Sequence, residues 1–358
     1  MWQRNELTQR LGLTWPIVQA PMAGSGTPQL AAAVGVAGGL GSLGCGTQTV
    51  EAARAQIEEA RRLGARPLNV NFFCHPEPAT DGAGDAAAMR RLLAPLFAAH
   101  GLGEPPPPGL PYPSFGPEHL ALVEATRPEV VSFHFGLPDA AAVAAVKAAG
   151  AMVWSSATTV EEARWLEARG ADVVIAQGIE AGGHRGTFLG ADPSHQAGTL
   201  ALVPQVADAV RVPVVAAGGI ADGRGVAAAL VLGASAAQLG TAFLRCPEAG
   251  VPPAHRAALA GARDDSTRVT RLFTGKPARA LRNRLTEELR EAEGDALAYP
   301  LQLSLTAPLR RVPDTGSAGD VLAMWSGQAA GLTRELPAGD LVRRLAEETE
   351  GALGRLGG

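Results

Sequence analysis

Residues 172–186, with the sequence DVVIAQGIEAGGHRG, contain the groups best suited to chemistry in this chain. An apolar stretch typical of a buried strand ends at Gln177, and a glycine-rich loop follows it. Because Gly182 and Gly183 carry no Cβ, the backbone there can approach a ligand closely. The loop presents His184, and a histidine can exchange a proton near neutral pH. A fixed strand, a thin loop and a titratable ring predict the edge of an active site, with His184 as a candidate catalytic residue.

Two other predicted strands end in polar side chains. Asn69 and Asn71 flank Val70, and the period of two along a strand puts both amides on one face. Asn71 is closer to the carboxyl end of its strand, where barrel enzymes build their sites, so we expect it to contact a ligand. Asn69 fits a hydrogen-bonded core amide equally well. His134 ends the next strand in the sequence SFHFG, and a structural or a catalytic role fits it.

Glycine and other small residues mark two later strand ends, in PVVAAGGIAD (213–222) and AAQLGT (236–241). Barrels commonly bind phosphate between their last two loops, with backbone N–H groups as donors. Gly218, Gly219, Gly240 and Thr241 leave such groups accessible. Neither loop has a basic residue and no GxxxxGK[ST] is present, which favours a tightly held phosphomonoester cofactor over a P-loop nucleotide site.

Two further motifs have plainer interpretations. GLGSLG (39–44) matches GxGxxG, but a helical stretch precedes it and its glycines fall within a predicted strand. We therefore expect close backbone packing there, not a dinucleotide site. Ala20, Pro21 and Met22 end the first strand, because proline cannot donate to a strand ladder. An ordinary turn and a wall of the site remain equally open for them.

Short apolar strands alternate with alanine-rich amphipathic helices along the chain. Strands are expected at residues 17–20, 40–43, 68–72, 130–133, 152–155, 173–176, 214–217 and 236–239. Helices are expected at 50–63, 139–149, 160–169, 200–210 and 225–232. Apolar strands separated by helices indicate a parallel sheet, and eight such units in about 250 residues predict a (β/α)8 barrel. A doubly wound open sheet is the competing architecture.

Two segments interrupt this alternation. The proline-rich segment 76–117, with one predicted helix at 86–99, follows the third strand and is expected to cover the barrel mouth as a lid. The more charged segment 244–298 is expected to be a small helical insert after the eighth strand. The predicted organisation is a cofactor-binding barrel in residues 1–243, the insert, and a segment 299–358 that completes the barrel and ends in an amphipathic helix.

Composition excludes several classes of function. The net charge of -4, the pI near 6.0 and 4% aromatic residues do not favour nucleic acid or an anionic membrane. Cys45, Cys74 and Cys246 are too far apart for a CxxC site, and no HExxH is present, so we expect no metal. A polar N-terminus and the lack of a long apolar helix predict a cytoplasmic protein. We expect it to be a monomer or a homodimer.

These motifs, in this order, resemble those of the nitronate monooxygenase family (class I), formerly called 2-nitropropane dioxygenases. The resemblance covers most of the chain and continues through FTGKPAR (273–279), YP (299–300) and MWSGQ (324–328). It implies a barrel that binds FMN. The flavin contacts it implies are Ala20, Pro21, Met22, Asn71, Gln177, Gly182, Gly183, Gly218, Gly219, Gln238, Leu239, Gly240 and Thr241.

The resemblance also implies an activity. It is the oxidation of alkyl nitronates with O2 to a carbonyl product and nitrite or nitrate, with propionate 3-nitronate as the leading substrate. His184 would be the base that removes a proton from a nitroalkane, and His134 the second histidine of the pocket. The alternative is an NAD(P)H:quinone or enoyl reductase on the same barrel, whose members generally lack FHFG and often have an apolar residue in place of Arg185. A barrel without flavin is a more distant alternative.

Overall fold

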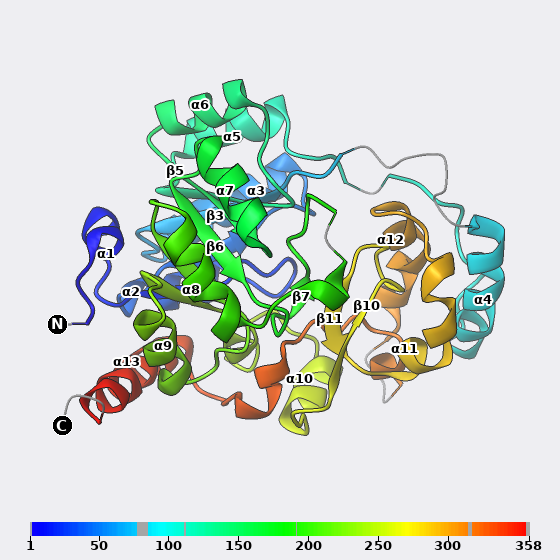
Figure 1. The fold of residues 1–358 in the computed structure, drawn as a ribbon. Helices are drawn as coiled ribbons and strands as arrows, with labels where there is room; N and C mark the ends of the chain where they lie inside the picture. Colours follow the sequence, from blue (N-terminus) through cyan, green and yellow to red (C-terminus); the bar gives the residue numbers. More distant parts are fainter. Residues whose placement is uncertain (1, 77–84, 111, 191, 314–316, 356–358) are drawn as a thin grey trace.

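Eight parallel strands form the central sheet of the computed structural model, which describes residues 2–76, 85–110, 112–190, 192–313 and 317–355 (Figure 1). Their order is β1-β9-β8-β6-β5-β4-β3-β2, and a bridge between Val18 and Leu40 closes the sheet into a barrel. The strands are β1 (Ile17–Gln19), β2 (Gly41–Gly44), β3 (Leu68–Phe73), β4 (Val130–His134), β5 (Met152–Ala157), β6 (Val173–Gln177), β8 (Val214–Ala217) and β9 (Ala236–Leu239). The predicted barrel is confirmed.

Helices connect the strands and cover the outside of the barrel. Side-chain oxygens begin many of them: Thr49 accepts the N–H of Ala52, and Asp222 accepts that of Arg224, as N-caps do. The barrel helices are α2 (Pro28–Val36), α3 (Val50–Arg62), α5 (Pro117–Thr126), α6 (Ala140–Ala148), α7 (Val160–Ala168), α8 (Thr199–Ala209) and α9 (Gly223–Val231). The last helix, α13 (Ala338–Gly354), packs against α9 and α2.

The amino end of the barrel is closed. A cluster of buried residues gathers side chains from most strands, including Val18, Trp154 and Ile175. Leu7 of α1 (Glu6–Leu11) and Leu13 pack against this layer. Because apolar side chains fill that end, space for a ligand remains at the carboxyl ends of the strands.

The GxGxxG motif has the packing role expected from the sequence. A Cβ at Gly41 would lie 2.1 Å from the carbonyl oxygen of Ala31, and one at Gly44 would lie 2.7 Å from the backbone nitrogen of Ala23. The helix α2 and the first turn therefore approach β2 more closely than any side chain would permit.

The segment after β9 contains strands as well as helices. Its helices include α10 (Pro253–Ala260), α11 (Arg284–Glu288) and α12 (Leu301–Thr306). Two strands, β10 (Thr267–Thr270) and β11 (Ala278–Leu281), pair with each other, and β11 also pairs with β7 (Gly183–His184) from the barrel loop. The insert was expected to be helical, but it contributes two strands to a three-stranded antiparallel sheet. The sequence did not indicate these strands, because they are short and each carries an arginine, which is typical of surface helices.

The proline-rich segment supplies a helix to a second hydrophobic core, at the side of the barrel in Figure 1. Leu93 and Phe97 of α4 (Ala86–Ala99) pack in a cluster with Phe273 of the insert and Leu305 of α12. The segment expected to complete the barrel is therefore divided, since α12 joins this second core and α13 returns to the barrel. Residues 77–84 and 111 of the predicted lid lie outside the described residues. No described helix is long and apolar enough to cross a membrane.

We predict that Gly41→Ala lowers the free energy of unfolding by about 1–3 kcal/mol, because the new methyl group meets immobile backbone. Gly351→Ala in α13 is the matched control, since its Cβ has only Arg355 Nη1 near it, at 3.9 Å. That change should raise stability by up to about 1 kcal/mol. Urea denaturation measures both, and equal effects would contradict the packing role.

Candidate active site

A cavity of about 390 Å³ lies at the carboxyl ends of the barrel strands. It brings together nearly all the residues singled out from the sequence: Ala20, Pro21, Met22, Asn71, His134, Gln177, Gly182, Gly183, His184, Gly218, Gly219, Gln238, Gly240 and Thr241. Leu239 does not line it. That side chain is 1% exposed in the main hydrophobic core, and its carbonyl accepts the N–H of Ala20 at 2.8 Å. Leu239 therefore supports the turn that follows β1 from the side of the hydrophobic core.

His184 lies in a strand instead of a free loop. It pairs with Ala278 of β11, and its Nε2 lies 3.0 Å from the hydroxyl oxygen of Thr274. The single proton of that hydroxyl goes to the carbonyl oxygen of Lys276, at 3.2 Å. With this assignment, Nε2 of His184 is the donor to Thr274. Nδ1 then keeps its lone pair, and the ring can accept a proton there.

Burial lowers the pKa of His184 to about 3, and the charges of His134, Lys276 and Arg310 act in the same direction. The ring is therefore neutral at physiological pH, which a general base requires. A base of such low pKa is, however, a weak proton acceptor, because proton transfer depends on the difference in acidity.

His134 has a protein partner at each ring nitrogen. Its Nε2 donates to the carbonyl oxygen of His184 at 3.1 Å, and the hydroxyl of Ser156 lies 3.0 Å from its Nδ1. Burial lowers the pKa of His134 to about 4, so the ring is neutral and Ser156 donates to it. This arrangement fixes the backbone beside His184.

The amide of Gln177 spans the same loop. Its Nε2 donates to the carbonyl oxygen of His184 at 3.0 Å, and its Oε1 accepts the N–H of Gly186 at 2.8 Å. The amide therefore braces the loop, and one N–H remains for a ligand. The contact with the polar edge of the flavin that the resemblance implied would use that remaining hydrogen.

Arg185 is fully buried and holds the loop from the other side. Its guanidinium donates to the carbonyl oxygens of Gln177 and Gly178 and to the side-chain oxygen of Gln196, each at 2.7 Å. Burial lowers the pKa of this group to about 10. Neutral oxygens thus satisfy a buried cation whose five donors form a rigid fork, a geometry that lysine cannot supply.

Several features of the cavity fit a bound phosphorylated cofactor. The Oε1 of Gln238 is buried without a partner, and a ligand N–H or O–H would satisfy it. A Cβ at Gly182 would lie 2.6 Å from the backbone nitrogen of Gly327, and one at Gly218, where φ is 111°, would lie 3.0 Å from that of Ala181. These glycines let neighbouring backbone segments pack closely around the cavity. Asn71 gives its N–H groups to Ser132, so its oxygen remains free to accept.

Part of the wall comes from the chain after β9, which the sequence-based prediction did not include in the site. Tyr299 and Trp325 pack against the ring of His184, with centroids 5.6 and 5.4 Å away. Arg310 lines the same end and is the one permanently charged side chain among the described lining residues, which include no Asp or Glu. His255, to which we gave no role, is 4% exposed and its Nε2 has no partner. Tyr299 and Trp325 lay in motifs of the family resemblance, YP (299–300) and MWSGQ (324–328), whereas Arg310 and His255 lay in none.

Comparisons with known proteins show the family of this chain. The family model described as nitronate monooxygenase matches residues 4–348. The chain is 46% identical to a nitronate monooxygenase of Pseudomonas aeruginosa over 97% of this chain and 99% of that protein. It is similar to the crystal structure of a nitroalkane oxidase from Streptomyces ansochromogenes, with 43% identity, a TM-score of 0.89 and coverage of 98% and 100% of the two chains.

The structure of FabK from Thermotoga maritima is a more distant neighbour, with 30% identity, a TM-score of 0.77 and coverage of 99% and 98%. Fold and site together define an oxidoreductase built on a (β/α)8 barrel. The chain belongs to the nitronate monooxygenase family.

We predict that Arg185→Met lowers the free energy of unfolding by about 3 kcal/mol or more, because three buried acceptors lose their donors. Arg185→Lys should recover less than half of the loss, since one ammonium group cannot reproduce the fork. Arg164→Met, at an exposed position of α7, is the control and should change stability by less than about 0.5 kcal/mol. Chemical denaturation that finds Arg185→Met no worse than this control would reject the role.

Proposed function

We propose that this protein binds FMN and uses O2 to oxidise alkyl nitronates, with propionate 3-nitronate as the leading substrate. The products would be a carbonyl compound and nitrite or nitrate. The observation that carries the proposal is the charge of the cavity, where Arg310 stands beside two neutral histidines and no described lining residue is acidic. Such a wall suits an anionic substrate. Membership of the family supports the reaction class.

The residues that line the cavity would contact FMN in different ways. Gln238, Asn71 and the free N–H of Gln177 offer polar contacts, and the glycines at 182, 218 and 219 line the same cavity. When bound, FMN supplies the electron transfer and O2 chemistry that side chains cannot provide.

Residues of the segment 299–358, which follows the insert, would orient the substrate. Tyr299 and Trp325 enclose an apolar end of the cavity next to His184, and Arg310 lies at the same end, since its charge acts on both His184 and Tyr299. A nitronate placed there could direct a carboxylate at its far end toward the guanidinium, which binds carboxylates in a forked geometry.

A nitronate needs no proton removed before it is oxidised, whereas a nitroalkane must first lose its α-proton. Nδ1 of His184 is the group that would take this proton, and Thr274 holds the ring in the required tautomer. His134 was predicted to be catalytic, but both of its nitrogens are occupied, so we assign it the positioning of the His184 backbone. The weak basicity of His184 favours nitronates over nitroalkanes as substrates.

The similarity to FabK keeps a reductase as the alternative. We would record the visible spectrum of the FMN-loaded protein without oxygen, and then add either propionate 3-nitronate or NADH. A change of the flavin spectrum with the nitronate supports the proposal. A flavin spectrum that does not change with the nitronate but is bleached by NADH would indicate a reductase. Failure to take up FMN would reject both the nitronate oxidation and the reductase alternative.

We expect His184→Asn to lower turnover of a neutral nitroalkane by about 10²–10⁴-fold, the usual contribution of a positioned base, and to change nitronate turnover far less. Thr274→Val should show a smaller loss of the same kind, and Thr274→Ser should restore activity because it keeps the hydroxyl. Steady-state kinetics with both substrates measures the difference. An equal fall for nitroalkane and nitronate would show that His184 is not the base.

The low pKa of His184 also predicts a pH profile. Since the neutral ring is the active form and its pKa is about 3, protonation does not remove the base as pH falls from 7.5 to 5.5. Turnover of a bound nitroalkane should therefore be flat across that range. An ordinary histidine, with a pKa near 6.5, would lose about 90% of its base form by pH 5.5. Such a loss of kcat would contradict the buried, neutral ring.

Arg310→Ala should raise KM for propionate 3-nitronate about tenfold and leave KM for ethyl nitronate, which has no carboxylate, nearly unchanged. Arg310→Lys should give an intermediate value. Arg311→Ala is the matched control, because Arg311 is exposed like Arg310 but does not line the cavity. If both nitronates lose affinity equally, Arg310 does not select the carboxylate.

A further inference from the structure

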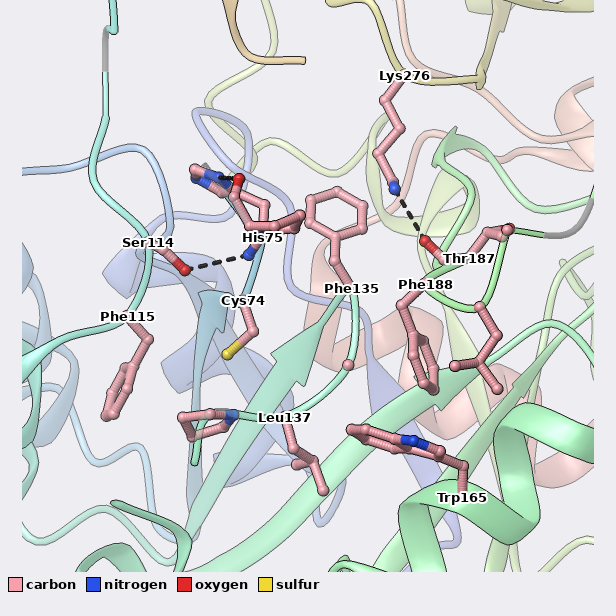
Figure 2. Close-up of a pocket in the computed structure, with 15 residues that line it drawn as sticks. Cys74, His75, Ser114, Phe115, Phe135, Leu137, Trp165, Thr187, Phe188 and Lys276 are labelled. Carbon is pink, nitrogen blue, oxygen red and sulfur yellow. Dashed lines mark hydrogen bonds between the residues drawn. The ribbon is translucent and has the colours of Figure 1, made fainter. Parts of the chain in front are cut away.

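A second cavity, of about 490 Å³, opens beside the first, between the loops that follow β3, β4 and β7. It shares no lining residue with the catalytic cavity. Figure 2 shows its residues, with Lys276 and Phe135 at one side and Trp165 and Phe188 at another. A volume of this size is in the range of cavities that bind small molecules.

Phe135 separates the two cavities. Its ring lines the second cavity, and it also contacts His134, His184 and Tyr299 of the catalytic cavity, at centroid distances of 4.6, 5.8 and 5.5 Å. Its φ of 73° is unusual for a bulky residue, and such strain is found where surrounding packing holds a functional site. The second cavity is therefore a compartment of its own.

The wall of this compartment is aromatic and apolar. Trp165 and Phe188 pack together with centroids 4.9 Å apart, and Arg169 lies over the Trp165 ring at 4.0 Å. Phe115 extends the apolar surface on the opposite side in Figure 2, and Leu137 lies between it and Trp165. None of the described lining residues is an Asp or Glu.

Lys276 places one positive charge at this wall. Its Nζ donates to the carbonyl oxygen of Thr187 at 2.8 Å and lies 4.4 Å from the centre of the Phe135 ring. No ion pair joins it to a carboxylate in the described ranges of the chain. Glu162 is the acid whose charge acts on it, but that carboxylate already accepts from Thr158 and from backbone N–H groups of residues 188 and 189. The ammonium therefore has donors left for a ligand.

We propose that the second cavity binds a small molecule with an aromatic or apolar body and one carboxylate. The carboxylate would meet Lys276, and the body would lie between the Trp165–Phe188 pair and Phe115. This inference does not depend on nitronate oxidation, because it rests on a compartment outside the catalytic cavity.

Isothermal titration of the FMN-loaded full chain tests the proposal, with 4-phenylbutyrate as the probe and 4-phenyl-1-butanol as its uncharged counterpart. Phenylbutyrate should bind about tenfold more tightly, the usual effect of one charge-assisted hydrogen bond. Lys276→Met should abolish this preference, and Lys276→Arg should keep most of it. Lys147→Met is the matched control, because Lys147, the only other lysine, is paired with Asp172 on the surface.

A second variant covers the case in which Lys276→Met does not fold. Leu189, 42% exposed at the rim, can be changed to Trp to fill the cavity, and this should block both probes while FMN stays bound. Lack of saturable binding at millimolar probe would overturn the proposal. So would equal affinity for the two probes, or displacement of phenylbutyrate by saturating propionate 3-nitronate, which would place the probe in the catalytic cavity.

Discussion

The attachment of the His184 loop to the end of β6 is the constraint on which the rest of the site depends. Glycines 182 and 183 keep this loop thin enough to admit a ligand, but they also make it intrinsically flexible. Arg185, Gln177 and His134 remove that freedom by bonding to the backbone on both sides of His184. A buried guanidinium is tolerated here because it donates to three protein oxygens, each at 2.7 Å.

The barrel strands and the chain after β9 contribute different parts of the candidate site. Strand ends of the barrel provide a glycine-lined cradle and amide groups, which suit a cofactor common to many reactions. The chain after β9 provides Tyr299, Trp325 and Arg310, which face the substrate end. Cofactor binding and substrate choice therefore depend on separate parts of the chain, and β7 is the element where the two parts meet.

The barrel could be predicted because most of its strands are short apolar runs buried on both faces, a local property of the sequence. Site residues at the ends of barrel strands, such as Asn71 and His134, could be predicted in the same way. Residues such as Arg310 and His255 could not be placed, because their positions depend on how the insert folds over the mouth. β7 was missed since two residues show no periodicity and their partner is almost a hundred residues later. Leu239 faces the core because neighbours on a strand alternate.

The pairing of β7 with β11 has a consequence for the history of the fold. The insert is not a self-contained structural unit. One of the three strands of its sheet is β7, which belongs to the barrel loop and carries His184. Replacing the insert with one from another lineage would disturb the geometry of the proposed base, even if no residue of the barrel changed. Recombination at this boundary should therefore be rare, and new specificity should arise by point substitution within the insert.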